Sequence, residues 1–182
     1  MKVKPTALTW QHQILKRPAS MHLKWMIVLL FLSFSGFAQK KSIGKLLRTY
    51  NSGSVPYISV EELKMKQDEY LILDSRKAEE FEVSHLPNAI RVDDRLDETT
   101  LERIRKSNKK IVVYCSVGVR SEDFGEKLQK KTTKPILNLY GGIFAWKDAG
   151  FPIFNDEGKP TERVHTFSKN WQDYLSTGIA VY

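Results

Sequence analysis

The alternation of short apolar runs with helix-forming segments from residue 57 onward is the feature that most constrains the fold of this chain. Residues 70–74 (YLILD), 110–114 (KIVVY) and 136–140 (ILNLY) are compact apolar runs, which predict buried strands. Residues 90–92 (IRV) predict a further short strand, and helical patterns lie at 77–83, 99–107, 121–131 and 143–149. Strands separated by helices predict an α/β fold, with a mostly parallel sheet and helices on both faces.

Local capping signals set the expected starts of three helices. Ser59 and Thr99 are each followed three residues later by glutamate, which is the spacing of a capping box. Ser121 is the expected cap of the helix that follows the third strand. Gly150 and Pro152 are expected to end the last helix.

The length of 182 residues and the 41 % hydrophobic content fit one packed domain, which we expect over residues 57–154. A single cysteine excludes an internal disulfide framework and a zinc site built on several thiolates. Residues 39–56 are expected to be a linker with a helical turn. In the C-terminal extension, residues 155–182, four apolar residues at helical spacing are expected to pack on the domain: Phe167, Trp171, Tyr174 and Leu175.

The first 38 residues resemble an export leader. Residues 25–34 (WMIVLLFLSF) follow a short basic start, and Gly36 and Ala38 precede a candidate cleavage point, so a signal peptide is expected over about 21–38. This apolar run is too short for a stable membrane anchor, and no cysteine follows it to carry a lipid. The sequence therefore predicts an exported protein, periplasmic or extracellular, without a stable anchor after cleavage.

The basic net charge is mostly a property of that leader. The whole chain has 29 Lys and Arg against 21 acids, a net charge of +8, and five of the basic residues lie in the first 38 residues with no acid. The remainder therefore carries 24 minus 21, or +3. Nucleic-acid binding needs a concentrated basic face, so no nucleic-acid partner is expected.

The only cysteine directly follows the strongest predicted strand, at the start of residues 115–120 (CSVGVR). A tight loop between a strand and a helix turns backbone N–H groups inward, and the helix N-terminus adds partial positive charge. Gly118 relieves backbone crowding, and Arg120 supplies a permanent cation. These features favour the thiolate form and a nucleophilic role for Cys115; the alternative is a small buried hydrophobe.

Four segments resemble the signatures of the rhodanese family and occur in the family's order between residues 55 and 154. They are residues 73–76 (LDSR) with Glu80 and Phe81, residues 84–89 (SHLPNA), the six-residue loop 115–120, and residues 139–142 (LYGG) followed by Trp146, Gly150 and Pro152. Ser84 and Asn88 stand where the family usually has glycine; asparagine tolerates a left-handed backbone. The resemblance implies a five-stranded parallel sheet with helices on both sides.

The resemblance also implies a sulfurtransferase. Cys115 would take the outer sulfur of a donor such as thiosulfate and hold it as a persulfide until cyanide, a small thiol or a protein thiol removed it. The persulfide-binding loop would be Ser116, Val117, Gly118, Val119 and Arg120. Asp74 and Arg76 would support the strand end, and His85 would stabilise a turn rather than act as a general base. No metal or organic cofactor is implied, and the two valines leave the donor open.

Three alternatives from other classes remain. Rhodanese-like modules also act as non-catalytic binding domains, and an exported thiol without a resolving partner could serve in thiol redox chemistry. A cysteine phosphatase uses a similar loop, but such loops typically have five residues between cysteine and arginine. Here there are four, which makes a smaller pocket and argues against a phosphatase.

Overall fold

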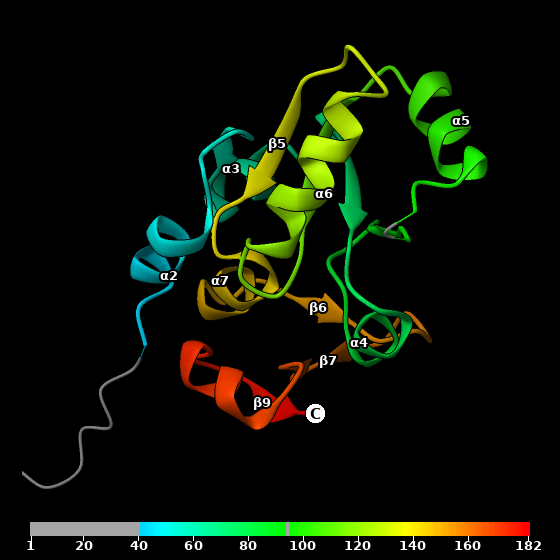
Figure 1. Cartoon of the computed structure of the whole chain (residues 1–182). Helices are drawn as coiled ribbons and strands as arrows, with labels where there is room; N and C mark the ends of the chain where they lie inside the picture. Colours follow the sequence, from blue (N-terminus) through cyan, green and yellow to red (C-terminus); the bar gives the residue numbers. More distant parts are fainter. Residues whose placement is uncertain (1–40, 94) are drawn as a thin grey trace, which may run out of the picture. The chain divides into compact units, whose positions relative to one another are not determined.

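The computed structural model describes residues 41–93 and 95–182, within the compact unit Lys40–Tyr182 (Figure 1). The predicted leader and signal peptide lie outside the described residues. In the described part of the chain, no helix is long and apolar enough to cross a membrane.

A five-stranded sheet forms the centre of this unit, and neighbouring strands pair in parallel. The strand order is β1-β5-β4-β2-β3. The strands are β1 (Tyr57–Ile58), β2 (Tyr70–Asp74), β3 (Ile90–Arg91), β4 (Lys110–Tyr114) and β5 (Ile136–Leu139). The predicted α/β class, with five parallel strands, is confirmed.

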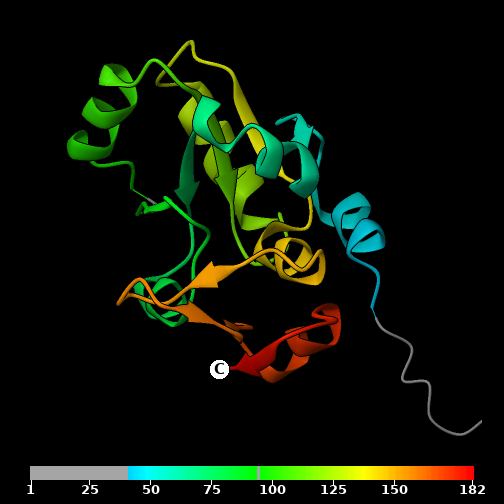
Figure 2. The same ribbon diagram turned by 180° about the vertical axis from the view of Figure 1, so that it is seen from behind.

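Helices cover both faces of the sheet, as the two buried clusters show. The first cluster joins side chains from α2, α3 and α7 to one face of the strands, and the second joins side chains from α5 and α6 to the other. Figure 1 shows α5 and α6 on one side, and Figure 2 shows the same layers from behind. The helices are α2 (Ile43–Tyr50), α3 (Val60–Met65), α4 (Ala78–Val83), α5 (Glu98–Lys106), α6 (Arg120–Gln129) and α7 (Gly142–Asp148), with a short 3₁₀ turn η1 (Gln67–Glu69) before β2.

Two of the three expected helix caps were placed wrongly. Ser59 does cap α3, accepting a hydrogen bond from the Glu62 amide. The cap of α5 is Asp97 rather than Thr99, because its carboxylate accepts from the Thr100 amide at 2.7 Å. Helix α6 begins at Arg120, since Val119 already has helical backbone angles, and Ser121 therefore lies inside the first turn.

Residues 43–50, expected as part of a linker, form the two-turn helix α2. Ser42 caps this helix through the Lys45 amide, and Leu46 and Leu47 are buried. The physical reason is amphipathicity: Ile43, Leu46 and Leu47 lie at helical spacing and give one apolar face that the core can cover.

The C-terminal extension lies at the end of the sheet toward which the strand arrows point (Figures 1 and 2). It contains β7 (Pro160–Thr161), which pairs antiparallel with β6 (Ile153–Phe154) at the end of the domain. It also contains the parallel pair β8 (Arg163–His165) and β9 (Ile179–Val181), and the 3₁₀ helix η2 (Lys169–Tyr174). Val164 and Leu175 join the first buried cluster, and Trp171 and Tyr174 pack against it. Phe167 precedes η2 and does not share the expected helical face, because its backbone is left-handed at φ +65°.

Candidate active site

Cys115 lies at the carboxyl end of β4, where the first turn of α6 faces the end of the sheet. Its thiol is buried. The Gly118 amide donates to Sγ at 3.2 Å, and the Ser121 hydroxyl oxygen lies 3.5 Å from the same sulfur. The loop 115–120 therefore places one backbone amide, that of Gly118, within hydrogen-bond distance of the sulfur.

The conformation of Gly118 depends on two asparagines. Its φ of +103° favours glycine, and an added Cβ would lie 3.3 Å from the Leu139 carbonyl oxygen. Asn138 of β5 and Asn51, which ends α2, each donate from Nδ2 to the Gly118 carbonyl at 2.9 Å. The Ser121 hydroxyl lies 2.8 Å from Oδ1 of Asn138. Sequence reasoning missed Asn138, although a polar residue inside an apolar strand was a visible signal.

The start of α7 supports the loop from the other side. The amides of Ile143 and Phe144 donate to the carbonyls of Cys115 and Ser116 at 3.0 and 3.1 Å. Gly142 permits this approach, because an added Cβ would lie only 2.2 Å from the Cys115 carbonyl oxygen. Gly142 of the LYGG segment therefore allows α7 to lie against the loop 115–120.

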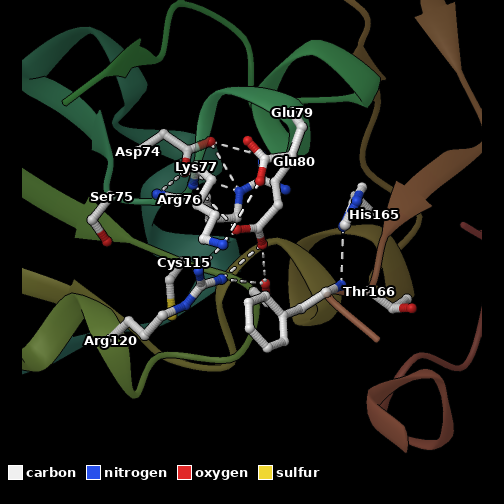
Figure 3. Close-up of polar contacts among 12 residues, drawn as sticks. Asp74, Ser75, Arg76, Lys77, Glu79, Glu80, Cys115, Arg120, His165 and Thr166 are labelled. Atoms are coloured by element: carbon white, nitrogen blue, oxygen red, sulfur yellow. Dashed lines mark hydrogen bonds and ion pairs between the residues drawn. The ribbon is translucent and has the colours of Figure 1, made fainter. Parts of the chain in front are cut away.

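Arg120 is held by Glu80, a partner that the sequence analysis did not assign. Its Nη1 and Nη2 donate to the two carboxylate oxygens of Glu80 at 2.8 and 2.7 Å, and Nη2 also reaches the Ser116 hydroxyl at 3.0 Å (Figure 3). Burial opposes ionisation of Glu80, but the hydrogen bonds and charge of Arg120 outweigh it and lower the Glu80 pKa. The negative charge of Glu80 therefore balances the positive charge of Arg120.

Asp74 and Arg76 form a fully buried ion pair at the end of β2. The Nη2 of Arg76 lies 2.7 Å from Oδ2 of Asp74 and donates to the Ser84 carbonyl at 2.6 Å. The same guanidinium lies over the Tyr114 ring at 5.6 Å from its centroid. These contacts tie the strand end to the loop after α4.

The turn at residues 84–89 forms although Ser84 and Asn88 replace the glycines that the family usually has at these two positions. Ser84 has an extended backbone, and Asn88 takes the left-handed conformation at φ +59°. His85 stacks on Phe81 with ring centroids 4.1 Å apart, and its Nδ1 lies 3.0 Å from the Leu86 carbonyl oxygen. The His85 ring therefore contacts other residues of the turn and of α4.

A pocket of about 130 Å³ opens at Cys115. The loop contributes Cys115, Ser116, Val117, Val119 and Arg120, and the extension contributes Phe167 and Trp171. Five of the expected site residues thus line one pocket, whereas Gly118, Asp74, Arg76 and His85 do not line it. The sequence analysis assigned the two aromatic residues only to packing.

Comparison with known proteins agrees with this fold. The family model described as the rhodanese-like domain matches residues 59–149, and the chain belongs to this family. A solved thiosulfate sulfurtransferase from Pseudomonas aeruginosa has a TM-score of 0.52 at 24 % identity, covering 58 % of this chain and 21 % of that one; this likeness concerns the fold. A Rhodopseudomonas palustris structure, described as a protein of unknown function and possible tyrosine phosphatase, has a TM-score of 0.50 at 28 % identity, covering 65 % and 99 % of the two chains.

Two curated relatives share about a third of their aligned residues with the chain. A Bacillus subtilis protein named as a sulfur carrier is 33 % identical over 99 residues, which is 53 % of each chain. A tRNA uridine(34) hydroxylase from Bacillus licheniformis is 32 % identical over 87 residues, covering 45 % of this chain and 27 % of that enzyme. The chain therefore spans about half of the first relative and about a quarter of the second.

Proposed function

We propose that this protein is a sulfurtransferase that carries sulfane sulfur as a persulfide on Cys115. The observation that carries the proposal is the Gly118 amide donating to Cys115 Sγ at 3.2 Å, where Cys115 lines a pocket of about 130 Å³. Membership of the rhodanese-like family and the relative named as a sulfur carrier support it.

The proposed chemistry takes two displacements at sulfur. The Cys115 thiolate attacks the outer sulfur of the donor, a new S–S bond forms, and the donor's own bond to that sulfur breaks. With thiosulfate the leaving group is sulfite, which departs with the electron pair of the broken bond. An acceptor such as cyanide or a thiolate then attacks the terminal sulfur and releases the Cys115 thiolate.

The loop would stabilise the charge that moves between the two sulfurs. The Gly118 amide already points at Sγ, and preorganised donors of this kind need no reorganisation during the reaction. No general base is required, because the attacking group is a thiolate. Arg120 holds the loop through Ser116 and Glu80, and its remaining exposed edge faces the pocket mouth.

The test is the intact mass of the purified protein after incubation with thiosulfate. A gain of one sulfur atom, reversed by cyanide or a reducing thiol and absent in Cys115→Ala, is the expected result. Protein with a free, reduced thiol that gains no sulfur from thiosulfate or from an organic donor would contradict the proposal and favour a binding module.

The same geometry argues against a phosphatase function. Only four residues separate Cys115 from Arg120, and the arginine fork that would bind a phosphate is taken by Glu80. Release of phosphate from an aryl phosphate, lost in Cys115→Ser, would reverse this conclusion.

Export to the periplasm or the outside of the cell belongs to the same proposal. It rests on the apolar segment at residues 25–34 and the small residues Gly36 and Ala38. N-terminal sequencing of protein recovered from the expressing cells tests it: a mature terminus at Gln39 is expected, and an intact Met1 or Met21 terminus would overturn it.

A further inference from the structure

The pocket over Cys115 is completed by residues that lie beyond the matched family segment 59–149. Phe167 and Trp171 come from the C-terminal extension and form the wall opposite the loop. Val117 and Val119 line the loop side of the same pocket. Four of the side chains around the sulfur are therefore apolar, and two of them are aromatic.

Phe167, which lines this pocket, has a left-handed backbone. Its φ of +65° is unfavourable for any residue with a Cβ, and such strain collects at functional sites. A tight turn maintains it: the Phe167 amide lies 3.0 Å from Nδ1 of His165, and the Ser168 amide donates to the Thr166 carbonyl at 2.7 Å. The ring is still about half exposed, so a bound molecule can contact it.

Two cations flank the Phe167 ring. The guanidinium carbon of Arg120 and the Nζ of Lys77 lie 5.3 and 5.5 Å from its centroid. Because Arg120 is neutralised by Glu80, these contacts orient the ring without giving the pocket a strong positive charge. A doubly charged anion is strongly hydrated, and entering this pocket would replace part of its hydration shell with apolar side chains. The neutralised Arg120 offers little net positive charge to offset that cost.

We propose that Phe167 and Trp171 are specificity-determining residues that select an organic sulfane-sulfur donor over inorganic thiosulfate. The donor class is a monoanion with carbon next to the sulfur pair, such as an organic thiosulfonate or persulfide. Its carbon group would lie against the two rings while its terminal sulfur reaches Cys115. This inference rests on the proposed sulfur transfer to Cys115.

The transfer from a thiosulfonate balances without any further reactant. The Cys115 thiolate attacks the terminal sulfur of R–SO₂–S⁻, an S–S bond forms, and the bond between that sulfur and the sulfonyl sulfur breaks. The electron pair leaves with the sulfinate R–SO₂⁻, and Cys115 carries the persulfide anion. Two negative charges stand on each side of the step.

The test compares the rate constants for sulfur loading of Cys115 from benzenethiosulfonate and from thiosulfate, followed by intact mass on the full chain. Wild type is expected to prefer benzenethiosulfonate. Phe167→Gly removes the ring and relieves the backbone strain, and Trp171→Ala removes the second ring. Each is expected to lower the ratio of the two rate constants by about tenfold, the discrimination typical of a small apolar contact.

Two further variants separate ring contact from general damage. Phe167→Leu keeps apolar bulk and is expected to give an intermediate ratio, while Tyr182→Ala changes an exposed aromatic of the same extension and is expected to keep the wild-type ratio. If Phe167→Gly and Trp171→Ala both load sulfur with the wild-type ratio of rate constants, the inference about donor selection is overturned, but the proposed sulfur transfer is not. Absence of loading from either donor in wild type would overturn the proposed function, and the inference with it.

Discussion

Arg120 and Glu80 meet through two parallel hydrogen bonds, from Nη1 to Oε2 at 2.8 Å and from Nη2 to Oε1 at 2.7 Å. The pair joins the first residue of α6 to the middle of α4, forty positions away in the sequence. It also fixes Ser116 through a bond to its hydroxyl. The loop 115–120 is therefore anchored to a second element of the fold by a charge pair rather than left with a free arginine.

Replacing Glu80 with glutamine is expected to lower the free energy of unfolding at neutral pH by about 2 kcal/mol. This is less than the roughly 3–5 kcal/mol for breaking a fully buried pair, because the Arg120 side chain is 37 % exposed. The folded-state pKa of Glu80 is below 4.5, so its stabilisation is fully present above that pH and is lost as the pH falls through the folded value.

Urea unfolding of wild type and Glu80→Gln across this pH range checks both parts of the prediction. The difference in the free energy of unfolding between wild type and Glu80→Gln should become smaller as the pH falls into the acid range in which Glu80 is protonated. Glu79→Gln is the control, since Glu79 is an exposed carboxylate of the same helix, 3.8 Å from Lys77. A difference in the free energy of unfolding that stays constant down to acidic pH would show that Glu80 contributes no titrating charge pair.

Substituting alanine for Gly118 is expected to cost about 1–3 kcal/mol of folding free energy and to abolish sulfur loading of Cys115. The added Cβ would press on the Leu139 carbonyl oxygen and on Leu47, both at 3.3 Å, and the shift would move the amide away from Sγ. Gly53→Ala is a matched control because Gly53 also has a positive φ, of +75°, but open space around it. That variant should lose about 1 kcal/mol and load sulfur normally; equal loss of loading in both would point to general destabilisation.

Removing the charge of Asp74 should be among the most destabilising single changes in the described part of the chain. Asp74→Asn leaves the buried Arg76 guanidinium without its counter-charge, at a cost of about 3–5 kcal/mol. In the double variant Asp74→Asn with Arg76→Met no buried charge remains, so part of this loss should be recovered. Equilibrium urea unfolding compares the two; a double variant less stable than Asp74→Asn would contradict the prediction.

Local pattern was enough to predict the central strands. Residues 70–74 and 110–114 are predicted and observed with the same bounds, because each is an apolar run at the centre of the sheet that both faces bury. The edge strand β1 is only two residues long, and its pairing with β5 was not predicted. Such a short strand exists because its partner is present, and no local signal marks it.

The partners of the site residues depend on contacts between distant segments. Cys115 and Gly118 were predicted from the loop itself, but Glu80 reaches Arg120 only after α4 packs at the end of the sheet. The aromatic spacing in the extension indicated a packed face, which Trp171 and Tyr174 provide in part. The left-handed turn that separates Phe167 from them has no glycine, so the sequence did not reveal it.

Asn138 offers the sharpest test of how the loop is held. Its Nδ2 donates to the Gly118 carbonyl, and its Oδ1 lies 2.8 Å from the Ser121 hydroxyl, so this side chain connects β5 to the middle of the loop and to the first turn of α6. Asn138→Leu preserves size but leaves the buried Ser121 hydroxyl without this partner. The expected cost is about 1–3 kcal/mol, and sulfur loading should fall about ten- to a hundredfold because the Gly118 amide is no longer held in place.

The comparison of three variants distinguishes positioning from packing. Asn138→Asp should load sulfur more slowly than Asn138→Leu, because a carboxylate oxygen would face the Gly118 carbonyl and add negative charge near the persulfide. Asn51→Ala removes the other donor to the same carbonyl. Its sulfur-loading rate should fall less than that of Asn138→Leu, since Asn138 remains. Loading rates are read by intact mass and stability by urea unfolding. If Asn138→Leu loads sulfur at the wild-type rate, the asparagine fills space and the Gly118 amide is positioned by the glycine turn alone.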